Sequence, residues 1–145
     1  MHEDPQFYRS VFQANMGLLE GMIDWVRKVT SDCPFSKAER RKVELALEEA
    51  FVNVVRHAYK GAKAPVEIIC CKYPSKQVAF KIIDKGMPFN PLLQTKSNDA
   101  SLPIEERQEG GLGIFFMKKL MDEVHYERRH PFNVLTLVKN TNSST

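Results

Sequence analysis

Three polar side chains recur along one stripe of the longest predicted helix of this 145-residue chain. Glu49, Asn53 and His57 are spaced four residues apart, so on a helix they lie above one another on one face. A carboxylate and a carboxamide one turn apart can converge on a single cation or on a metal-bound water. A core helix with polar edge residues has the same pattern, so the stripe alone does not decide between a chemical and a structural role.

A second candidate site lies at Asp84, which ends a predicted strand and is followed by Gly86. An ionised carboxylate only accepts hydrogen bonds. It therefore accepts from the exocyclic amine of adenine and repels the carbonyl oxygen that guanine presents at the same place. Gly86 allows the backbone to approach a flat base closely. An ordinary turn at the end of a strand would have the same composition.

Glycines precede the third predicted helix, at Gly110, Gly111 and Gly113. Backbone N–H groups in such a turn, together with the positive end of the helix dipole, make a phosphate site. The turn is neither a P-loop nor a full GxGxxG motif, and a flexible hinge is the alternative.

The preceding polar segment, residues 90–109, is predicted to be a loop. Its Thr95 and Lys96 reach over phosphates if the loop is a lid, and a disordered insertion is the alternative reading.

Composition and charge exclude several classes of function. The chain has 21 basic and 18 acidic residues, and this net charge of +3 does not indicate direct binding to nucleic acid. No stretch approaches the roughly 18 apolar residues of a membrane span, and the N-terminus lacks a basic-then-apolar signal pattern. The three cysteines form no CxxC motif and are predicted to be buried free thiols. We therefore expect a cytoplasmic protein with no membrane contact.

The predicted elements position these candidates. Strands are predicted at 6–12, 66–73, 77–84, 124–128 and 133–139, and helices at 15–29, 37–60 and 114–123. The central helix begins with a capping-box pattern at Ser36 and Glu39 and ends at Gly61. Its apolar face consists of Val43, Leu47, Ala50, Val54 and Ala58.

The order of these elements has no alternating βαβ rhythm. It predicts an α+β fold, a two-layer α/β sandwich with a mostly antiparallel mixed sheet and the helices on one face. Residues 1–139 are predicted to form a single domain, and residues 140–145 a disordered tail.

Taken together, these segments resemble the GHKL ATPase superfamily. The resemblance covers about residues 10–139 and rests on four stretches. These are Glu49-Ala50-Phe51-Val52-Asn53 with His57-Ala58-Tyr59, Asp84-Lys85-Gly86-Met87-Pro88-Phe89, Gly110-Gly111-Leu112-Gly113-Ile114, and Met117-Lys118-Lys119-Leu120-Met121-Asp122-Glu123-Val124. The small size and the last stretch are similar to the bacterial anti-sigma factor serine/threonine-protein kinase branch.

The resemblance implies an ATP site between the helices and a lid, with Mg²⁺ held by Asn53. It implies that Glu49 takes the proton of the substrate hydroxyl. The implied ATP-binding residues are Asn53, Asp84, Gly86, Thr95, Lys96, Gly111, Leu112, Gly113 and Asn133. The last strand of the family commonly carries Gly-Thr near the adenine pocket. This chain has Phe132-Asn133 there, so either Asn133 or Thr136 supplies the polar contact of that threonine.

The resemblance also implies partners. In that branch the protein binds a sigma factor and phosphorylates an anti-anti-sigma protein of the STAS fold, and a PP2C-type phosphatase reverses the modification. This partner switching regulates transcription. The branch typically forms homodimers, for which the first strand and first helix would be the natural surface.

One departure leaves the activity open. The branch usually carries an arginine within the first helix, whereas the only arginine of that helix here is Arg27, near its end. The alternative function is therefore a nucleotide-binding switch that sequesters a sigma factor or STAS partner without phosphotransfer. A bare interaction domain that binds no nucleotide is a third hypothesis.

Overall fold

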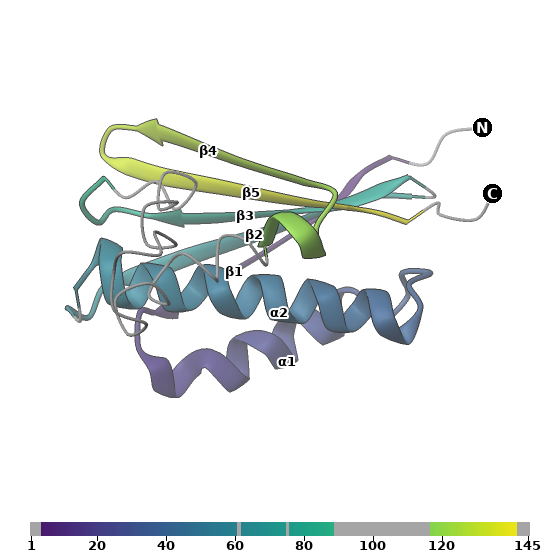
Figure 1. Ribbon diagram of the computed structural model, residues 1–145, viewed down its shortest axis with the longest axis horizontal. Coiled ribbons are helices and arrows are strands. Elements are labelled where there is room, and N and C mark those ends of the chain that lie inside the picture. The colour runs from purple at the N-terminus through teal and green to yellow at the C-terminus, as the bar shows by residue number, and fades with distance from the viewer. Residues whose placement is uncertain (1–3, 61, 75, 89–116, 142–145) are drawn as a thin grey trace, which may run out of the picture.

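The protein folds into two layers, a five-stranded sheet and a layer of helices that covers one of its faces (Figure 1). The computed structural model describes residues 4–60, 62–74, 76–88 and 117–141. In chain order the elements are β1 (Gln6–Gln13), the 3-10 helix η1 (Met16–Leu18), α1 (Leu19–Val29), α2 (Lys37–Asn53), the π-helical turn η2 (Val54–Ala58), β2 (Pro65–Tyr73), β3 (Gln77–Asp84), β4 (Glu123–Arg129) and β5 (Phe132–Asn140). A further short helix spans 117–120.

The strand order is β1-β2-β3-β5-β4. All four pairings between these described strands are antiparallel, in a sheet that the sequence predicted to be mixed and mostly antiparallel. The predicted α+β sandwich with helices on one face is confirmed. The predicted lid lies outside the described residues, and so do residues 142–145 of the predicted tail. No helix in the described ranges is long and apolar enough to cross a membrane.

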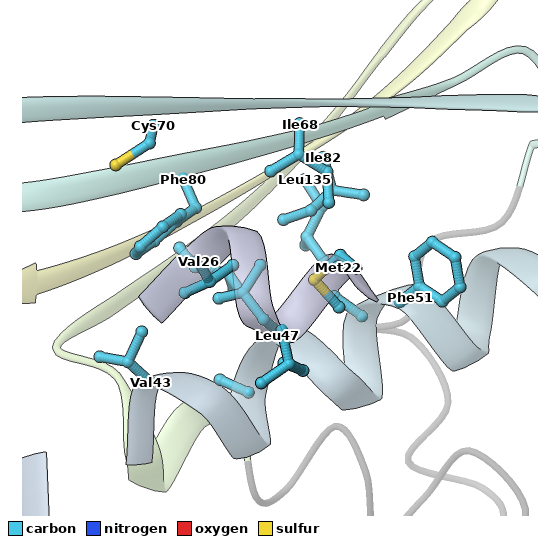
Figure 2. Packing of buried hydrophobic residues seen from close by; sticks show 14 of the residues in the cluster. Met22, Val26, Val43, Leu47, Phe51, Ile68, Cys70, Phe80, Ile82 and Leu135 are labelled. Carbon is cyan, nitrogen blue, oxygen red and sulfur yellow. The ribbon is translucent and has the colours of Figure 1, made fainter. Parts of the chain in front are cut away.

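The core lies between the sheet and the two long helices, and its side chains point into the space between the two layers (Figure 2). The largest fully buried side chains include Met22, Leu47, Phe51, Ile68, Phe80 and Leu137. Residue alternation places Cys70 in this core and Cys71 on the opposite face of the sheet, beside Ala79 and Val138. All three cysteines are buried and free, as predicted.

The central helix begins as predicted and ends differently. Ser36 Oγ accepts from Glu39 N (3.0 Å), and Glu39 Oε1 accepts from Ser36 N (2.9 Å), which completes the capping box. The prediction of one regular helix to Lys60 is wrong. The α-helix stops at Asn53 and continues as η2, in which Tyr59 N donates to Val54 O (3.0 Å), five residues back.

Tertiary contacts hold η2 in this wider turn. Ala58 O accepts from Met87 N (3.0 Å), in the segment that follows β3. The Tyr59 hydroxyl donates to Pro65 O (2.8 Å) and accepts from Lys85 N (2.8 Å). These bonds fasten the end of the central helix to the start of β2 and the end of β3.

The other helix boundaries also differ from the predictions. Asn15 caps η1 rather than a continuous helix, because its side chain accepts from Gly17 N (2.8 Å) and α1 begins only at Leu19. Lys60 has a φ of 50°, in the left-handed region, whereas Gly61, the predicted end of the helix, lies outside the described residues. The helix predicted to reach residue 123 ends at 120. Asp122 instead bonds to β5, donating from its N to Val138 O (2.8 Å).

Gly86 should be required for the packing of η2. A Cβ at this position would lie 2.4 Å from Ala58 O, which is too close for the two backbones to keep their present separation. We expect Gly86→Ala to lower the free energy of unfolding by about 1–3 kcal/mol, the usual cost of overpacking. Denaturant unfolding measures this change.

Gly21→Ala is the matched control for this substitution. Gly21 lies on an exposed turn of α1, and a Cβ there meets nothing within 4 Å. Alanine should stabilise the helix at this position by up to about 1 kcal/mol. Equal effects of the two substitutions would contradict the proposed role of the contact between Gly86 and Ala58.

Candidate functional site

A cavity lies where the end of the central helix meets the sheet. Its volume is about 20 Å³, and it is lined by Ala50, Asn53, Val54, Ala58, Ile82, Asp84, Tyr126, Asn133 and Leu135. It thus brings together Asn53, Asp84 and Asn133, which lie far apart in the sequence. The volume holds about one water molecule. A purine base is larger, so binding one requires the lining side chains to move apart.

Asn53 is the last residue of α2 and is buried, with 5% of its surface exposed. No described residue forms a hydrogen bond to its side-chain Nδ2. A buried donor left without a partner costs about 1–3 kcal/mol. Because Nδ2 is a hydrogen-bond donor and lines the cavity, we infer that it would bind an acceptor group of a ligand there.

Glu49 lies one helical turn before Asn53, on the same side of α2. It is half-buried and is not among the residues that line the cavity. Burial raises the pKa of its carboxyl group, and the positive charge of Arg56 opposes that rise. A carboxylate with a raised pKa is a better proton acceptor than an ordinary glutamate, which is what a general base requires.

The side-chain oxygen of Asn53 fits one kind of metal ion. Mg²⁺ takes oxygen ligands, keeps several waters and is usually held by one or two protein side chains together with substrate phosphates. The described ranges contain no group of three His, Cys, Asp or Glu side chains that would enclose a metal. Asn53 therefore fits a partly hydrated Mg²⁺ that arrives with a phosphate ligand, and Glu49 lies one turn away from it.

Asp84 ends β3 and is buried with its carboxylate on the helix side of the sheet. Its Oδ1 accepts two hydrogen bonds, from Asn133 Nδ2 (2.8 Å) and from Gly86 N (2.8 Å). Burial raises the pKa of Asp84, and these hydrogen bonds and the charge of Arg128 oppose the rise. No described residue donates to Oδ2, which leaves this oxygen for a ligand in the cavity.

The strand register decides between Asn133 and Thr136 as the polar neighbour of this carboxylate. Asn133 is the direct partner of Asp84 in the pairing of β3 with β5. Thr136 lies three residues further along β5, where it pairs with Lys81, and alternation directs its side chain to the opposite face. Asn133 therefore contacts Asp84, and Thr136 does not.

Two residues of this site were missed in the sequence. Tyr126 Oη donates to Asn133 Oδ1 (2.5 Å), and Arg128 Nη1 donates to the same oxygen (3.2 Å) and to Gly86 O (2.9 Å). Both lie on β4, two residues apart and therefore on one face. That alternation was visible in the predicted strand 124–128, but it gave no sign that the strand would lie beside residue 133.

The remaining predicted site residues are Thr95, Lys96, Gly111, Leu112 and Gly113. All of them lie outside the described residues. Their contacts with the phosphates of ATP remain predictions.

Comparison with known proteins adds evidence that is independent of this geometry. Serine-protein kinase RsbW of Bacillus mycoides is 29% identical over 104 residues, which is 70% of this chain and 64% of that protein. Serine/threonine-protein kinase BtrW of Bordetella bronchiseptica is 26% identical over 117 residues, which is 81% of this chain and 82% of that protein. The match to the Bacillus protein thus spans just under two thirds of its length.

A solved structure has the same fold. The crystal structure of the RsbU and RsbW domains of a Mycobacterium tuberculosis protein superposes with a TM-score of 0.64 and 14% identity, covering 92% of this chain and 32% of the other. The family model for the histidine kinase-like ATPase domain matches residues 12–139, which include each described residue of the cavity. By this match, the chain belongs to the histidine kinase-like ATPase family.

Proposed function

We propose that this chain is an anti-sigma factor with ATP-dependent serine/threonine-protein kinase activity, which phosphorylates an anti-anti-sigma protein of the STAS fold. The observation that carries the proposal is the convergence of Asn53, Asp84 and Asn133 on one cavity, with Glu49 one turn away. The names of the relatives, a serine-protein kinase and a serine/threonine-protein kinase, support the same reaction.

ATP is the nucleotide that suits this cavity. The Oδ2 of Asp84, to which no described residue donates, would accept a hydrogen bond from the exocyclic amine of adenine. Asn53 would hold Mg²⁺, which would supply charge neutralisation at the phosphates. Gly111, Leu112 and Gly113 would bind the phosphates and Thr95 and Lys96 would belong to a lid, as the family resemblance implies.

Glu49 would accept the proton of a serine or threonine hydroxyl while the hydroxyl oxygen bonds to the terminal phosphorus of ATP and the bond from that phosphorus to ADP breaks. Its half-buried carboxylate lies at the metal end of the site, because it precedes Asn53 by one turn. Arg56 is a described cation at the same end of the helix and is close enough to act on the pKa of Glu49. Its exposed guanidinium is available to a phosphate group.

The alternative function is a nucleotide-dependent switch without phosphotransfer, and one ion pair favours it. Arg27 of α1 donates to both carboxylate oxygens of Glu44 on α2, at 2.9 and 3.0 Å. Glu44 precedes Asn53 by nine residues, or about 13 Å along a helix. Arg27 therefore joins two helices, away from the site. Arginine support of a transferring phosphoryl group is worth roughly 10³–10⁵ in rate where it is present.

Protein partners follow from the same proposal. They are a sigma factor, the STAS protein, a PP2C-type phosphatase that reverses the phosphorylation, and a second copy of this chain, all in the cytoplasm. Large apolar side chains are exposed on β1 and η1, namely Phe7, Tyr8, Val11, Met16 and Leu18. Phe7 and Val11 lie on one face of β1 and Tyr8 on the other. Since β1 is also an edge strand, its edge and these side chains support a homodimer through the first strand and the first helical segment.

Asp84→Ala should abolish the stabilisation of the protein by Mg-ATP. ATP at 100 times its Kd should stabilise the wild-type fold by about 2.7 kcal/mol, measured as a rise in Tm. The alanine variant loses the acceptor for the adenine amine. Asp24→Ala, at an exposed carboxylate of α1, is the control and should keep the full response. A full response of Asp84→Ala would contradict the assigned role of Asp84.

Glu49→Gln should lower label transfer from ATP to the purified STAS partner by about 10²–10⁴, the usual contribution of a general base. Stabilisation by ATP should persist, because the amide keeps the shape of the side chain. Glu48→Gln, the neighbouring carboxylate of α2, is the matched control and should retain transfer. Absence of transfer by the wild-type protein would favour the switch, and undiminished transfer by Glu49→Gln would exclude Glu49 as the base.

On acidification, kcat/KM of the phosphotransfer should begin to decrease at a higher pH than it would with an ordinary glutamate as the base. Burial raises the pKa of Glu49, so its basic form is lost earlier as the pH decreases. The acidic limb of kcat/KM against pH, measured with the STAS partner, locates this pKa in the free enzyme. If the pKa from this limb is at or below the ordinary pKa of glutamate, the half-buried Glu49 is not the general base.

A further inference from the structure

The carboxamide of Asn133 uses all of its hydrogen-bonding capacity within the protein. Its Nδ2 donates to Asp84 Oδ1 (2.8 Å) and to Met87 O (2.9 Å). Its Oδ1 accepts from Tyr126 Oη (2.5 Å) and from Arg128 Nη1 (3.2 Å). The residue is buried, with 4% of its surface exposed. A carboxamide with two donors and two acceptor positions filled has nothing left for a ligand.

The partners of Asn133 also fix its orientation. A guanidinium only donates, so Arg128 requires the oxygen of Asn133 on its side. The carbonyl of Met87 and the carboxylate of Asp84 only accept, so they require the nitrogen on theirs. A flipped carboxamide would put donor against donor and acceptor against acceptor, and each buried mismatch is costly.

The fixed orientation of Asn133 determines which kind of atom the side chain at position 84 can place beside it. Asn133 Nδ2 and Gly86 N both donate to Oδ1, so whatever atom occupies that place must be an acceptor. Asp84 satisfies this with one carboxylate oxygen, and its second oxygen is left toward the cavity. An asparagine at position 84 would have to place its carbonyl oxygen at the Oδ1 position. Its NH₂ group would then take the place of Oδ2 and present donors to the cavity.

We propose that Asn133 is a positioning residue that Arg128 and Tyr126 hold in one orientation, so that the side chain at position 84 selects between 6-amino and 6-oxo purine nucleotides. With aspartate the site takes the 6-amino base of ATP and rejects a base with a carbonyl group at that position. With asparagine the preference reverses. The inference rests on the proposed function, because it requires that the cavity bind the purine of a nucleotide.

The experiment measures the Kd of Mg-ATP and of Mg-ITP by calorimetry. ITP carries a carbonyl oxygen where ATP carries the amine and lacks the 2-amino group of GTP. For the wild-type protein the ratio of Kd(ITP) to Kd(ATP) should be about ten or more, since a mismatched buried hydrogen bond costs about that factor. In Asp84→Asn the ratio should fall below one.

Two variants at position 133 separate the positioning role from simple structural damage. Asn133→Ala should weaken ATP binding and leave the preference for ATP intact, because a carboxylate has no donor in any orientation. The double variant Asp84→Asn/Asn133→Ala should lose part of the reversed preference, because only the N–H of Gly86 then holds the carboxamide of residue 84 in place. Thr136→Ala, on the same strand and the opposite face, is the matched control and should leave the ratio unchanged.

The outcomes distinguish this inference from the function on which it rests. A wild-type protein that binds neither nucleotide overturns both. If the wild-type protein prefers ATP and Asp84→Asn keeps that preference or shows none, the inference alone is overturned. The same holds if the double variant keeps the full reversed preference of Asp84→Asn, or if Asn133→Ala by itself removes the preference for ATP.

Discussion

The buried carboxylate of Asp84 constrains the structure around it. A buried charge without partners is unstable, and burial does raise the pKa of this group. Asn133 and the backbone of Gly86 supply hydrogen bonds, and Arg128 supplies a nearby positive charge. Because these partners come from β5, β4 and the segment after β3, three parts of the chain must meet at one end of the sheet. The same arrangement leaves one carboxylate oxygen for a ligand.

The π-helical turn η2 brings the helix layer to this point. It begins directly after Asn53 and is held by Ala58 O and the Tyr59 hydroxyl against the segment after β3. A regular α-helix would direct these groups differently, since the wider turn changes the rotation of each later residue. The π-helical turn, the close approach at Gly86 and an Asn53 Nδ2 that has no partner among the described residues thus occur together at the cavity. Such irregular features are common at functional sites.

Much of this could be predicted from the sequence. Helical spacing places Glu49 and Asn53 on one stripe, and strand alternation separates Cys70 from Cys71, because both periodicities are properties of the local backbone. The capping box at Ser36 and Glu39 involves residues only three apart, so it too is locally encoded. The element order was enough for the α+β sandwich. The glycine turn and lid residues lie outside the described ranges, and their roles remain predictions.

Long-range register was not available from the sequence. The pairing of Asp84 with Asn133, rather than a contact with Thr136, depends on how β3 aligns with β5 across 49 residues of chain. The roles of Tyr126 and Arg128 depend on the pairing of β4 with the edge of β5 that does not pair with β3. The change from α-helix to π-helix after Asn53 depends on contacts with Met87 and Lys85. The sequence by itself therefore determined which chemical groups are present and which local face each occupies. Only the tertiary structure decided which of them meet and in which direction they hydrogen-bond, because strand register and close packing are set by the whole core.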